Sequence, residues 1–200
     1  AVARNAVLRV RNVPIFYTPY ISFPVTDERL SGWLFPAVGY SSEDGFDLAA
    51  PYYLNLAPHY DATITPRVLS KRGVGVETEF RHLSVGGETV VGGAILPDDK
   101  LFDGTYDKDD FEELFPGQKF EEANRWLLSL DHTGRVGAFR TLVDYTAVSD
   151  RDYFRDLGSD LALSSRVDLE RRAQISYAQG GFDARLWVQR FQSIDEQFTL

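Results

Sequence analysis

Hydrophobic and polar residues alternate with a period of two along most of the chain after residue 44. Val76 and Phe80, for example, fall on one face of a predicted strand, and Glu77 and Glu79 fall on the other. Such alternation predicts β-strands, because successive side chains of a strand point to opposite faces of the sheet. The pattern predicts about eight strands, most of them roughly nine to eleven residues long, and this is the length of a tilted transmembrane β-strand.

The polar faces of these predicted strands carry many charged side chains. Aliphatic and aromatic residues on one face and charges on the other fit the wall of a β-barrel with a water-filled interior. A soluble antiparallel sheet with one solvated face gives the same alternation, so the pattern leaves both folds open. The charged positions are Glu77, Glu79, Arg81, Arg140, Asp144, Asp168, Glu170, Arg172, Asp183 and Arg185.

The chain before residue 45 has a different character. Residues 5–25 form two extended runs, "AVLRVRNV" and "PIFYTPYISFPV". In the first run apolar residues alternate with arginines, which is typical of a half-buried strand. Residues 26–44 are rich in turn-forming residues and are predicted to be a linker. The sequence therefore predicts an all-β protein in which a short N-terminal part and a linker precede a long series of antiparallel strands.

Three prolines lie in the strand-like stretch "DLAAPYYLNLAPHYDATITPRVL", residues 47–69. Proline has no backbone N–H to give to a sheet ladder, so in sheets it is normally confined to an edge or a bulge. Pro58 falls in the predicted turn "APHYD", but Pro51 and Pro66 lie in the middle of the runs on either side of it. These two prolines predict a weakly paired edge of the sheet, or an edge where proline discourages wrong pairing.

The composition narrows the range of functions. The 200 residues carry a formal net charge of -9, and this argues against nucleic-acid binding, which depends on neutralising phosphates. Cysteine is absent, so this segment holds no disulfide of its own. No apolar run has the length of a transmembrane helix. Because the chain opens directly in strand-like sequence, we expect it to be a segment of a longer protein.

No cluster of residues predicts catalysis, a metal site or a cofactor. The three histidines lack the spacing of a shared metal site. Ser149 and Asp150 have no histidine base near them in the sequence, and Asx turns explain this stretch. "KRGVGVET" lacks the third glycine of a dinucleotide-binding loop. The acidic stretch of residues 97–125 lacks the glycine and spacing of a calcium loop, so we expect a solvated loop. The sequence is interpreted as that of a non-enzyme.

Several long segments, however, resemble one protein family. They occur in order from about residue 5 to about residue 160, and beyond that point the resemblance rests on the strand pattern. The segments are "AVLRVRNVPIFYTPYISFPVTDERLSGWLFP", "PYYLNLAPHYDATITPRVLSKRG", "ETEFRHLS", "LPDDK", "NRWLLSLDHTG" and "VDYTAVSDRDYFRDL". Together they are similar to the lipopolysaccharide-assembly outer-membrane proteins LptD, also called OstA or Imp.

The resemblance implies a fold and a location. In this family a periplasmic β-jellyroll of the OstA type precedes a large transmembrane β-barrel. Residues 1–25 are then expected to be the C-terminal end of the jellyroll, residues 26–44 the linker, and residues 45–200 the first antiparallel strands of a barrel that is only partly contained in the chain. The implied location is the cell outer membrane, with the N-terminal part in the periplasm.

The resemblance also implies a function, namely the transport and insertion of lipopolysaccharide into the outer leaflet of the outer membrane. The acyl chains travel inside the jellyroll groove, and the lipid leaves through a lateral gate between the first and last barrel strands. The implied partners are lipopolysaccharide, outer-membrane lipids, the plug lipoprotein LptE and the periplasmic bridge protein LptA. No cofactor is implied, and the family's disulfide cysteines have no counterpart in this segment.

Site residues follow from the same resemblance. Pro51 and Pro66 match the prolines of the family's first two strands and are the expected lateral gate residues. The strand that starts at Gly45 is then the seam strand, and its outer edge is expected to pair with the last barrel strand. The residues expected nearest the lipid path in the jellyroll are Phe16, Tyr17, Tyr20, Ile21 and Phe23.

Two other functions remain open. One is a small closed outer-membrane barrel that acts as a porin or an enzyme, and the other is a soluble β-sandwich binding module.

Overall fold

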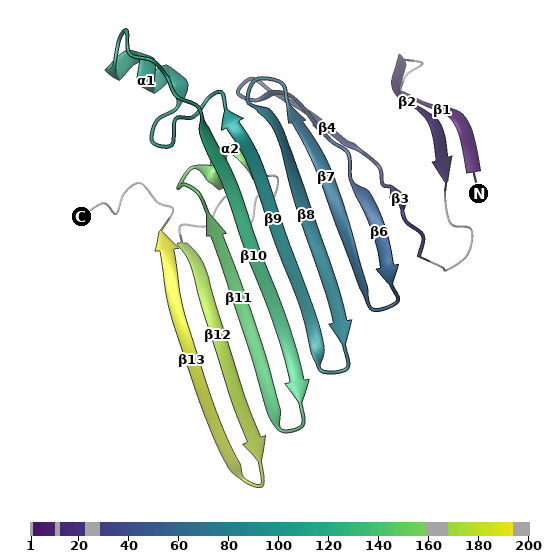
Figure 1. Cartoon of the computed structure of the whole chain (residues 1–200), viewed down its shortest axis with the longest axis vertical. Helices are drawn as coiled ribbons and strands as arrows, with labels where there is room; N and C mark the ends of the chain where they lie inside the picture. Colours follow the sequence, from purple (N-terminus) through teal and green to yellow (C-terminus); the bar gives the residue numbers. More distant parts are fainter. Residues whose placement is uncertain (1, 11–12, 23–28, 159–167, 194–200) are drawn as a thin grey trace.

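The structure, a computed structural model, describes residues 2–10, 13–22, 29–158 and 168–193. Antiparallel strands make up most of it, so the predicted all-β fold is confirmed (Figure 1). Two short helices lie in connections between strands, α1 at Lys108–Leu114 and α2 at Tyr153–Leu157. Among the described residues, no helix is long and apolar enough to cross a membrane.

The N-terminal part is a hairpin that forms a sheet of its own. Strand β1, Val2–Val10, pairs with β2, Val13–Ser22, in an antiparallel register that shifts between Leu8 and Arg9. The two extended runs predicted near the N-terminus are therefore confirmed as strands within the described residues.

The second sheet has eleven strands among the described residues. Its main path runs β13-β12-β11-β10-β9-β8-β7-β5-β4, and β6 pairs with both β7 and β3. The sheet is not closed, and its long strands lie side by side as successive hairpins (Figure 1). The strands are β3 Gly32–Trp33, β4 Ala37–Ser41, β5 Gly45–Ala49, β6 Tyr52–Ala57, β7 Tyr60–Leu69, β8 Gly73–Ser84, β9 Gly87–Asp99, β10 Ala123–Val136, β11 Phe139–Val148, β12 Asp168–Gln179 and β13 Phe182–Ser193.

The register of the large sheet separates its two faces. On the face that we call the outer face, Ile95 lies opposite Trp126 of the next strand. On the inner face, Arg81, Val90 and Asp131 lie opposite one another across β8, β9 and β10. The outer face exposes a continuous series of large apolar side chains, which are Val74, Phe80, Val91, Ile95, Trp126, Leu128, Phe139, Ile175, Leu186 and Val188.

The two ends of the sheet differ. At one end the strands are joined by tight turns, and at the other, the helix end, longer connections carry α1 and α2 (Figure 1). Helix α2 buries Tyr153, Phe154 and Leu157, each at most 7% exposed. These side chains join Leu69 of β7 and Leu96 of β9 in one hydrophobic cluster. The core of the described chain therefore lies at the helix end, where apolar residues of α2 are withdrawn from water.

Buried charges join the connections of the helix end to one another. Arg125 of β10 is fully buried and donates to Asp156 at 2.7 Å and to Asp99 at 3.3 Å. Arg72, in the turn before β8, donates to Asp99 at 2.9 Å and to Asp44 at 2.6 Å. Burial lowers the pKa of Arg72, but the hydrogen bond to Asp44 and the charges of Asp99 and Asp156 outweigh it and raise that pKa above its ordinary value.

Part of the expected linker is strand. Residues 32–33 and 37–41 form β3 and β4, which pair with β6 and β5 along the edge that was expected to face the last barrel strand. The physical reason is that an open sheet edge presents unpaired N–H and C=O groups, which favour pairing with any extended segment nearby. The acidic stretch of residues 97–125 is likewise not entirely loop, since it contains the end of β9, helix α1 and the start of β10.

Candidate functional site

The first long strand is interrupted where its proline lies. The alternation predicts one strand from Gly45, but the structure divides it into β5 and β6, with Ala50 and Pro51 between them. We call β5 and β6 together the first strand, and its edge toward β3 and β4 the outer edge. The break follows from the missing N–H of Pro51, which removes a ladder bond in mid-strand.

Three prolines lie at the level of this break on adjacent strands. Ala49 lies opposite Arg67 on one side and Ala37 on the other, so the same registers place Pro66 and Pro36 on either side of Ala50. We call Pro36, Pro51 and Pro66 the proline row. It crosses the first strand and both of its neighbours at the level where the first strand is interrupted.

The two gate prolines of the sequence prediction weaken different contacts. The carbonyl of Pro51 accepts a hydrogen bond from the N–H of Leu34 at 2.9 Å, so the backbone of Pro51 faces the outer edge. The carbonyl of Pro66 accepts from the N–H of Ala50 at 3.0 Å, so its backbone faces the first strand. Because N and C=O of an extended residue point the same way, Pro51 withholds a donor from the outer edge and Pro66 withholds one from the first strand.

The ladder between β7 and β8 is unaffected by Pro66. Its register continues from Tyr60 opposite His82 to Leu69 opposite Gly73 without a shift, and Pro66 lies opposite Val76 within it. The donor that Pro66 lacks is therefore missing on the side of the first strand, and the β7–β8 ladder is regular.

On the inner face, side chains bridge the strands that the prolines weaken. Arg67 of β7 donates through Nε and Nη2 to both carboxylate oxygens of Asp47 on β5, at 3.1 and 2.9 Å. Its Nη1 donates to Glu77 of β8 at 3.1 Å and to the carbonyl of Leu157 in α2 at 2.8 Å. We call Asp47, Arg67, Glu77 and Leu157 the Arg67 cluster. It ties three strands and α2 together one residue from Pro66.

A second group of side chains lies on the same face toward the tight turns. Asp61 of β7 is 3% exposed and accepts bonds from Arg81 of β8 at 2.8 and 3.1 Å. It also accepts from the hydroxyl of Tyr53 on β6 at 3.0 Å and from Arg29 at 3.2 Å. We call Tyr53, Asp61, Arg81 and Arg29 the Asp61 cluster. The proline row lies between the two clusters.

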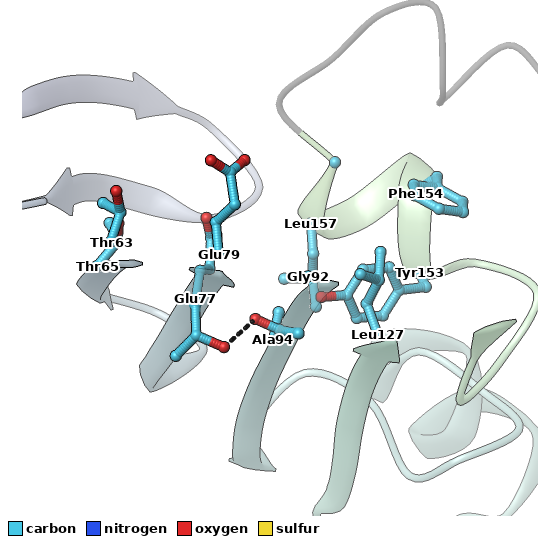
Figure 2. Close-up of a pocket in the computed structure, with 13 residues that line it drawn as sticks. Thr63, Thr65, Glu77, Glu79, Gly92, Ala94, Leu127, Tyr153, Phe154 and Leu157 are labelled. Atoms are coloured by element: carbon cyan, nitrogen blue, oxygen red, sulfur yellow. Dashed lines mark hydrogen bonds between the residues drawn. The ribbon is translucent and has the colours of Figure 1, made fainter. Parts of the chain in front are cut away.

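The inner face beside the Arg67 cluster is hollowed. A pocket of about 430 Å³ lies between α2 and strands β7 to β10. In Figure 2 Thr65 and Glu77 of the strands lie across the pocket from Tyr153 and Leu157 of α2. Burial raises the pKa of Tyr153 to about 12, so its phenol stays neutral at physiological pH. The pocket combines carboxylates and hydroxyls on one wall with apolar side chains on the other.

The residues expected along the lipid path are distant in sequence from the proline row, and their strand does not pair with the strands of the row. Phe16, Tyr17, Tyr20 and Ile21 belong to β2, which pairs with β1. Tyr17 is 58% exposed and its hydroxyl donates to Asn5 at 2.8 Å. Phe23 lies outside the described residues.

Sequence reasoning missed Pro36 and both inner-face clusters. The sequence contained a clue to Pro36, because Pro36, Pro51 and Pro66 are spaced fifteen residues apart. The sequence contained no clue to the roles of Arg67 and Asp61. Their partners on neighbouring strands depend on the register, and the register is fixed only when the strands pair. Among the described residues, no three histidine, aspartate or glutamate side chains are grouped so that they could hold a metal ion, and no metal site is assigned.

Comparison with known proteins decides the family. Residues 1–84 match the family described as LptD protein, and residues 123–199 match the family described as LPS transport system D. The chain belongs to the LptD family. The resemblance given by the sequence motifs is thus confirmed, and it extends beyond residue 160, where the motifs end.

Curated relatives carry the same family name over nearly the whole chain. "LPS-assembly protein LptD" of Pseudomonas aeruginosa strain UCBPP-PA14 is 44% identical over 95% of this chain and 19% of its own length. The LptD proteins of Ectopseudomonas mendocina strain ymp and Sodalis glossinidius strain morsitans are 42% and 40% identical over 95% and 96% of the chain. The chain spans 19 to 23% of the length of these relatives, so it corresponds to one segment of an LptD protein.

Proposed function

We propose that the chain is part of a protein that transports lipopolysaccharide and inserts it into the outer leaflet of the outer membrane. The observation that carries the proposal is the proline row at the first strand of a sheet with one apolar and one polar face. A sheet of this kind can part beside the first strand, where the prolines withhold backbone donors, while its other ladders stay closed. The name of the relatives, LPS-assembly protein, supports lipopolysaccharide as the molecule that passes.

In this proposal the large sheet is part of a β-barrel wall in the outer membrane. The outer face, with exposed apolar residues such as Phe80, Trp126 and Leu186, contacts lipid, and the inner face lines a water-filled lumen. The division into a jellyroll end at 1–25, a linker at 26–44 and barrel strands at 45–200 belongs to the same proposal. The jellyroll end is periplasmic.

Pro51 and Pro66 act as the lateral gate. Each proline leaves roughly 0.5–1.5 kcal/mol of net backbone hydrogen bonding unmade. Losses of this size are small against the stability of a barrel, but they are concentrated at the first strand. The first strand is therefore where a lipid can pass sideways from the lumen into the membrane at the lowest cost.

The proposed partners bind different parts of the chain. LptE, as a plug, contacts the polar inner face from within the lumen. LptA, as the periplasmic bridge, delivers lipopolysaccharide to the jellyroll, and outer-membrane lipids cover the outer face. The proposed activity is movement of a lipid, and no residue of the chain is assigned to a catalytic step or to a cofactor.

The test uses a photo-reactive benzophenone side chain in full-length protein produced in growing cells. It is placed at Phe16, Tyr17, Tyr20 or Ile21, one position at a time. Because neighbouring residues of a strand lie on opposite faces, the proposal predicts adducts with lipopolysaccharide at alternate positions only, either 16 and 20 or 17 and 21. Adducts are detected with an antibody against lipopolysaccharide.

Matched controls separate transport from chance contact. Cells deprived of metabolic energy before irradiation should lose the adducts, since lipid no longer enters the path. Absence of adducts at all four positions, in protein that still supports growth, would refute a lipid path along β2.

A further inference from the structure

Two arginines interrupt the apolar outer face of the large sheet. Arg171 of β12 lies directly opposite Arg190 of β13, on the same face as Ile175 and Leu186. The other described positions of this face, from β7 to β13 and up to the register shift near the start of β10, hold no lysine, arginine, aspartate or glutamate. The arginine pair is therefore an exception that needs a physical reason.

Neither arginine has an acidic partner among the described residues. Arg171 donates from Nε to the carbonyl of Thr146 at 3.1 Å and from Nη2 to the side-chain oxygen of Gln192. Its guanidinium carbon lies 5.2 Å from the centre of the Tyr145 ring. These neutral partners orient Arg171 but leave its charge uncompensated. Arg190 is exposed and makes no hydrogen bond or ion pair within the described part of the chain.

The placement of the pair is unfavourable without a further group. Side chains directly opposite each other on antiparallel strands have Cβ atoms about 4.5–5.5 Å apart, and like charges at such positions repel. The repulsion grows where lipid replaces water, because the dielectric constant falls. An anion held between the two guanidinium groups removes the repulsion and turns the pair into a binding site.

The surroundings of the pair indicate which anion fits. Each guanidinium presents a planar fork of N–H donors, and this geometry matches the oxygens of a phosphate group. Toward the tight turns the same face continues with Ile175 opposite Leu186, which are 42% and 69% exposed. This apolar row lies four residues from the arginines, about 14 Å along the strands. A charged head and a long apolar tail can therefore bind along one line.

We propose that Arg171 and Arg190 bind the phosphate group of a membrane phospholipid, whose acyl chains lie on the apolar rows of β12 and β13. The proposal rests on the proposed function for its place in the membrane. Both arginines lie three residues from the helix-end termini of their strands, so the lipid belongs to the periplasmic leaflet. Lipid-facing arginines are tolerated near a membrane interface and costly at the midplane, which agrees with this level.

The charge of the site also selects among phospholipids. Two guanidinium groups carry more positive charge than one phosphate compensates, and the outer face offers no carboxylate for a cationic headgroup. The site should therefore prefer a phospholipid with a net negative charge, such as phosphatidylglycerol, over the zwitterionic phosphatidylcholine.

The experiment is photo-crosslinking of full-length protein in phosphatidylcholine bilayers that contain a small fraction of phosphatidylglycerol with a diazirine in its acyl chain. Adducts are mapped by mass spectrometry of peptides, and they should appear in β12 and β13. In the double variant Arg171→Gln with Arg190→Gln, the yield of these adducts should fall about tenfold or more. Each single variant should give part of the loss.

Matched variants make the outcome specific. Arg185→Gln removes an arginine from the inner face of the same strand, opposite Ser176, and it should leave the adducts unchanged. Replacing Arg171 and Arg190 by lysine keeps the charges but loses the planar forks, and should give an intermediate yield. Arg190→Gln alone removes an exposed side chain that holds nothing in the described chain, so this variant should fold even if the double variant does not.

Competition identifies the bound group. Unlabelled phosphatidylglycerol should displace the labelled lipid, whereas extra phosphatidylcholine should displace much less of it and inorganic phosphate none. Displacement by inorganic phosphate would show a site for the free ion and contradict a lipid site. Stronger displacement by purified lipopolysaccharide than by phosphatidylglycerol would show a site for the transported lipid and contradict the assignment to a phospholipid.

Unchanged adducts in folded double-variant protein would overturn the inference. The readout does not depend on lipid export. Adducts of phosphatidylglycerol on β12 and β13 with no lipopolysaccharide adduct on β2 would contradict the proposed function alone. Lipopolysaccharide adducts on β2 without any phosphatidylglycerol adduct on β12 and β13 would contradict this inference alone.

Discussion

At the scale of single residues, the position of a proline matters less than the direction of the N–H that it lacks. Pro51 and Pro66 both lie in strand-like sequence, and their place near a weak edge could be predicted from the sequence. Which neighbour loses a bond could not, because the direction depends on the pairing of each strand. The same holds for Arg67 and Asp61, whose partners come from three strands and, for Arg67, from α2.

The first residue-scale prediction concerns the two faces. Phe80 points to the outer face and is 39% exposed, so Phe80→Arg should destabilise the full-length protein by about 2–4 kcal/mol if the site lies near the bilayer midplane. Glu79→Gln, one position away on the inner face, should cost less than about 1 kcal/mol. The measurement is reversible urea unfolding in lipid vesicles. Equal costs at both positions would show a soluble sheet and not a membrane wall.

At the scale of elements, the strands follow from alternation and the helices do not. The eight or so strands expected after residue 44 correspond to β5–β13 with the first one divided. No helix was predicted at α2, because five residues give too short a pattern for a helical period to be recognised. It is stabilised by contacts with Leu69 and Leu96, which are distant in sequence, and such tertiary contacts override local signals.

The strands β3 and β4 were missed for a related reason. Their residues are punctuated by glycine and proline, as in a linker, and they form strands because the outer edge of the first strand offers unpaired backbone groups. Sequence reasoning located the weak edge from Pro51 but did not supply the segment that covers it.

An element-scale prediction tests whether α2 is a structural part of the helix end. Leu157 is 6% exposed within the core cluster, so Leu157→Ala should destabilise the full-length protein by about 2–5 kcal/mol. Leu114 of α1 is 57% exposed, and Leu114→Ala should cost less than about 1 kcal/mol. The measurement is thermal unfolding of the two variants under the same conditions. Equal decreases in melting temperature would mean that α2 does not stabilise the sheet.

At the scale of the whole molecule, the proposal fixes the orientation in the membrane. A periplasmic jellyroll end requires the helix end of the sheet to be periplasmic and the tight turns to be extracellular. Val85 lies in a tight turn and is fully exposed, and the Lys119 side chain is 86% exposed in the connection that carries α1. These two positions are matched in accessibility, whereas Asp99 is fully buried and unsuited as a reporter of sidedness.

The expected outcome of cysteine labelling on intact cells follows directly. Full-length protein with Val85→Cys should react with a membrane-impermeant maleimide, and protein with Lys119→Cys should react only after the outer membrane is opened. Labelling of Lys119→Cys from outside with protection of Val85→Cys would reverse the orientation and remove the basis for a periplasmic jellyroll end.

The central claim is that proline keeps the edge of the first strand ready to part, and one measurement tests it most directly. In cells that depend on the full-length protein, the double variant Pro51→Ala with Pro66→Ala should fold and assemble normally, because alanine is accommodated in a strand. Two recovered hydrogen bonds strengthen the pairing by about 1–3 kcal/mol. The open population should then fall by about five- to a hundredfold.

Surface lipopolysaccharide, measured at matched protein levels, should fall together with the open population. Most of the loss should already be present in the single variant Pro51→Ala, because the recovered N–H faces the outer edge. A disulfide tether between the first and last strands of the full-length barrel provides the closed control. Normal surface lipopolysaccharide in the double variant, while the tether still blocks export, would contradict the claim that the prolines form the gate.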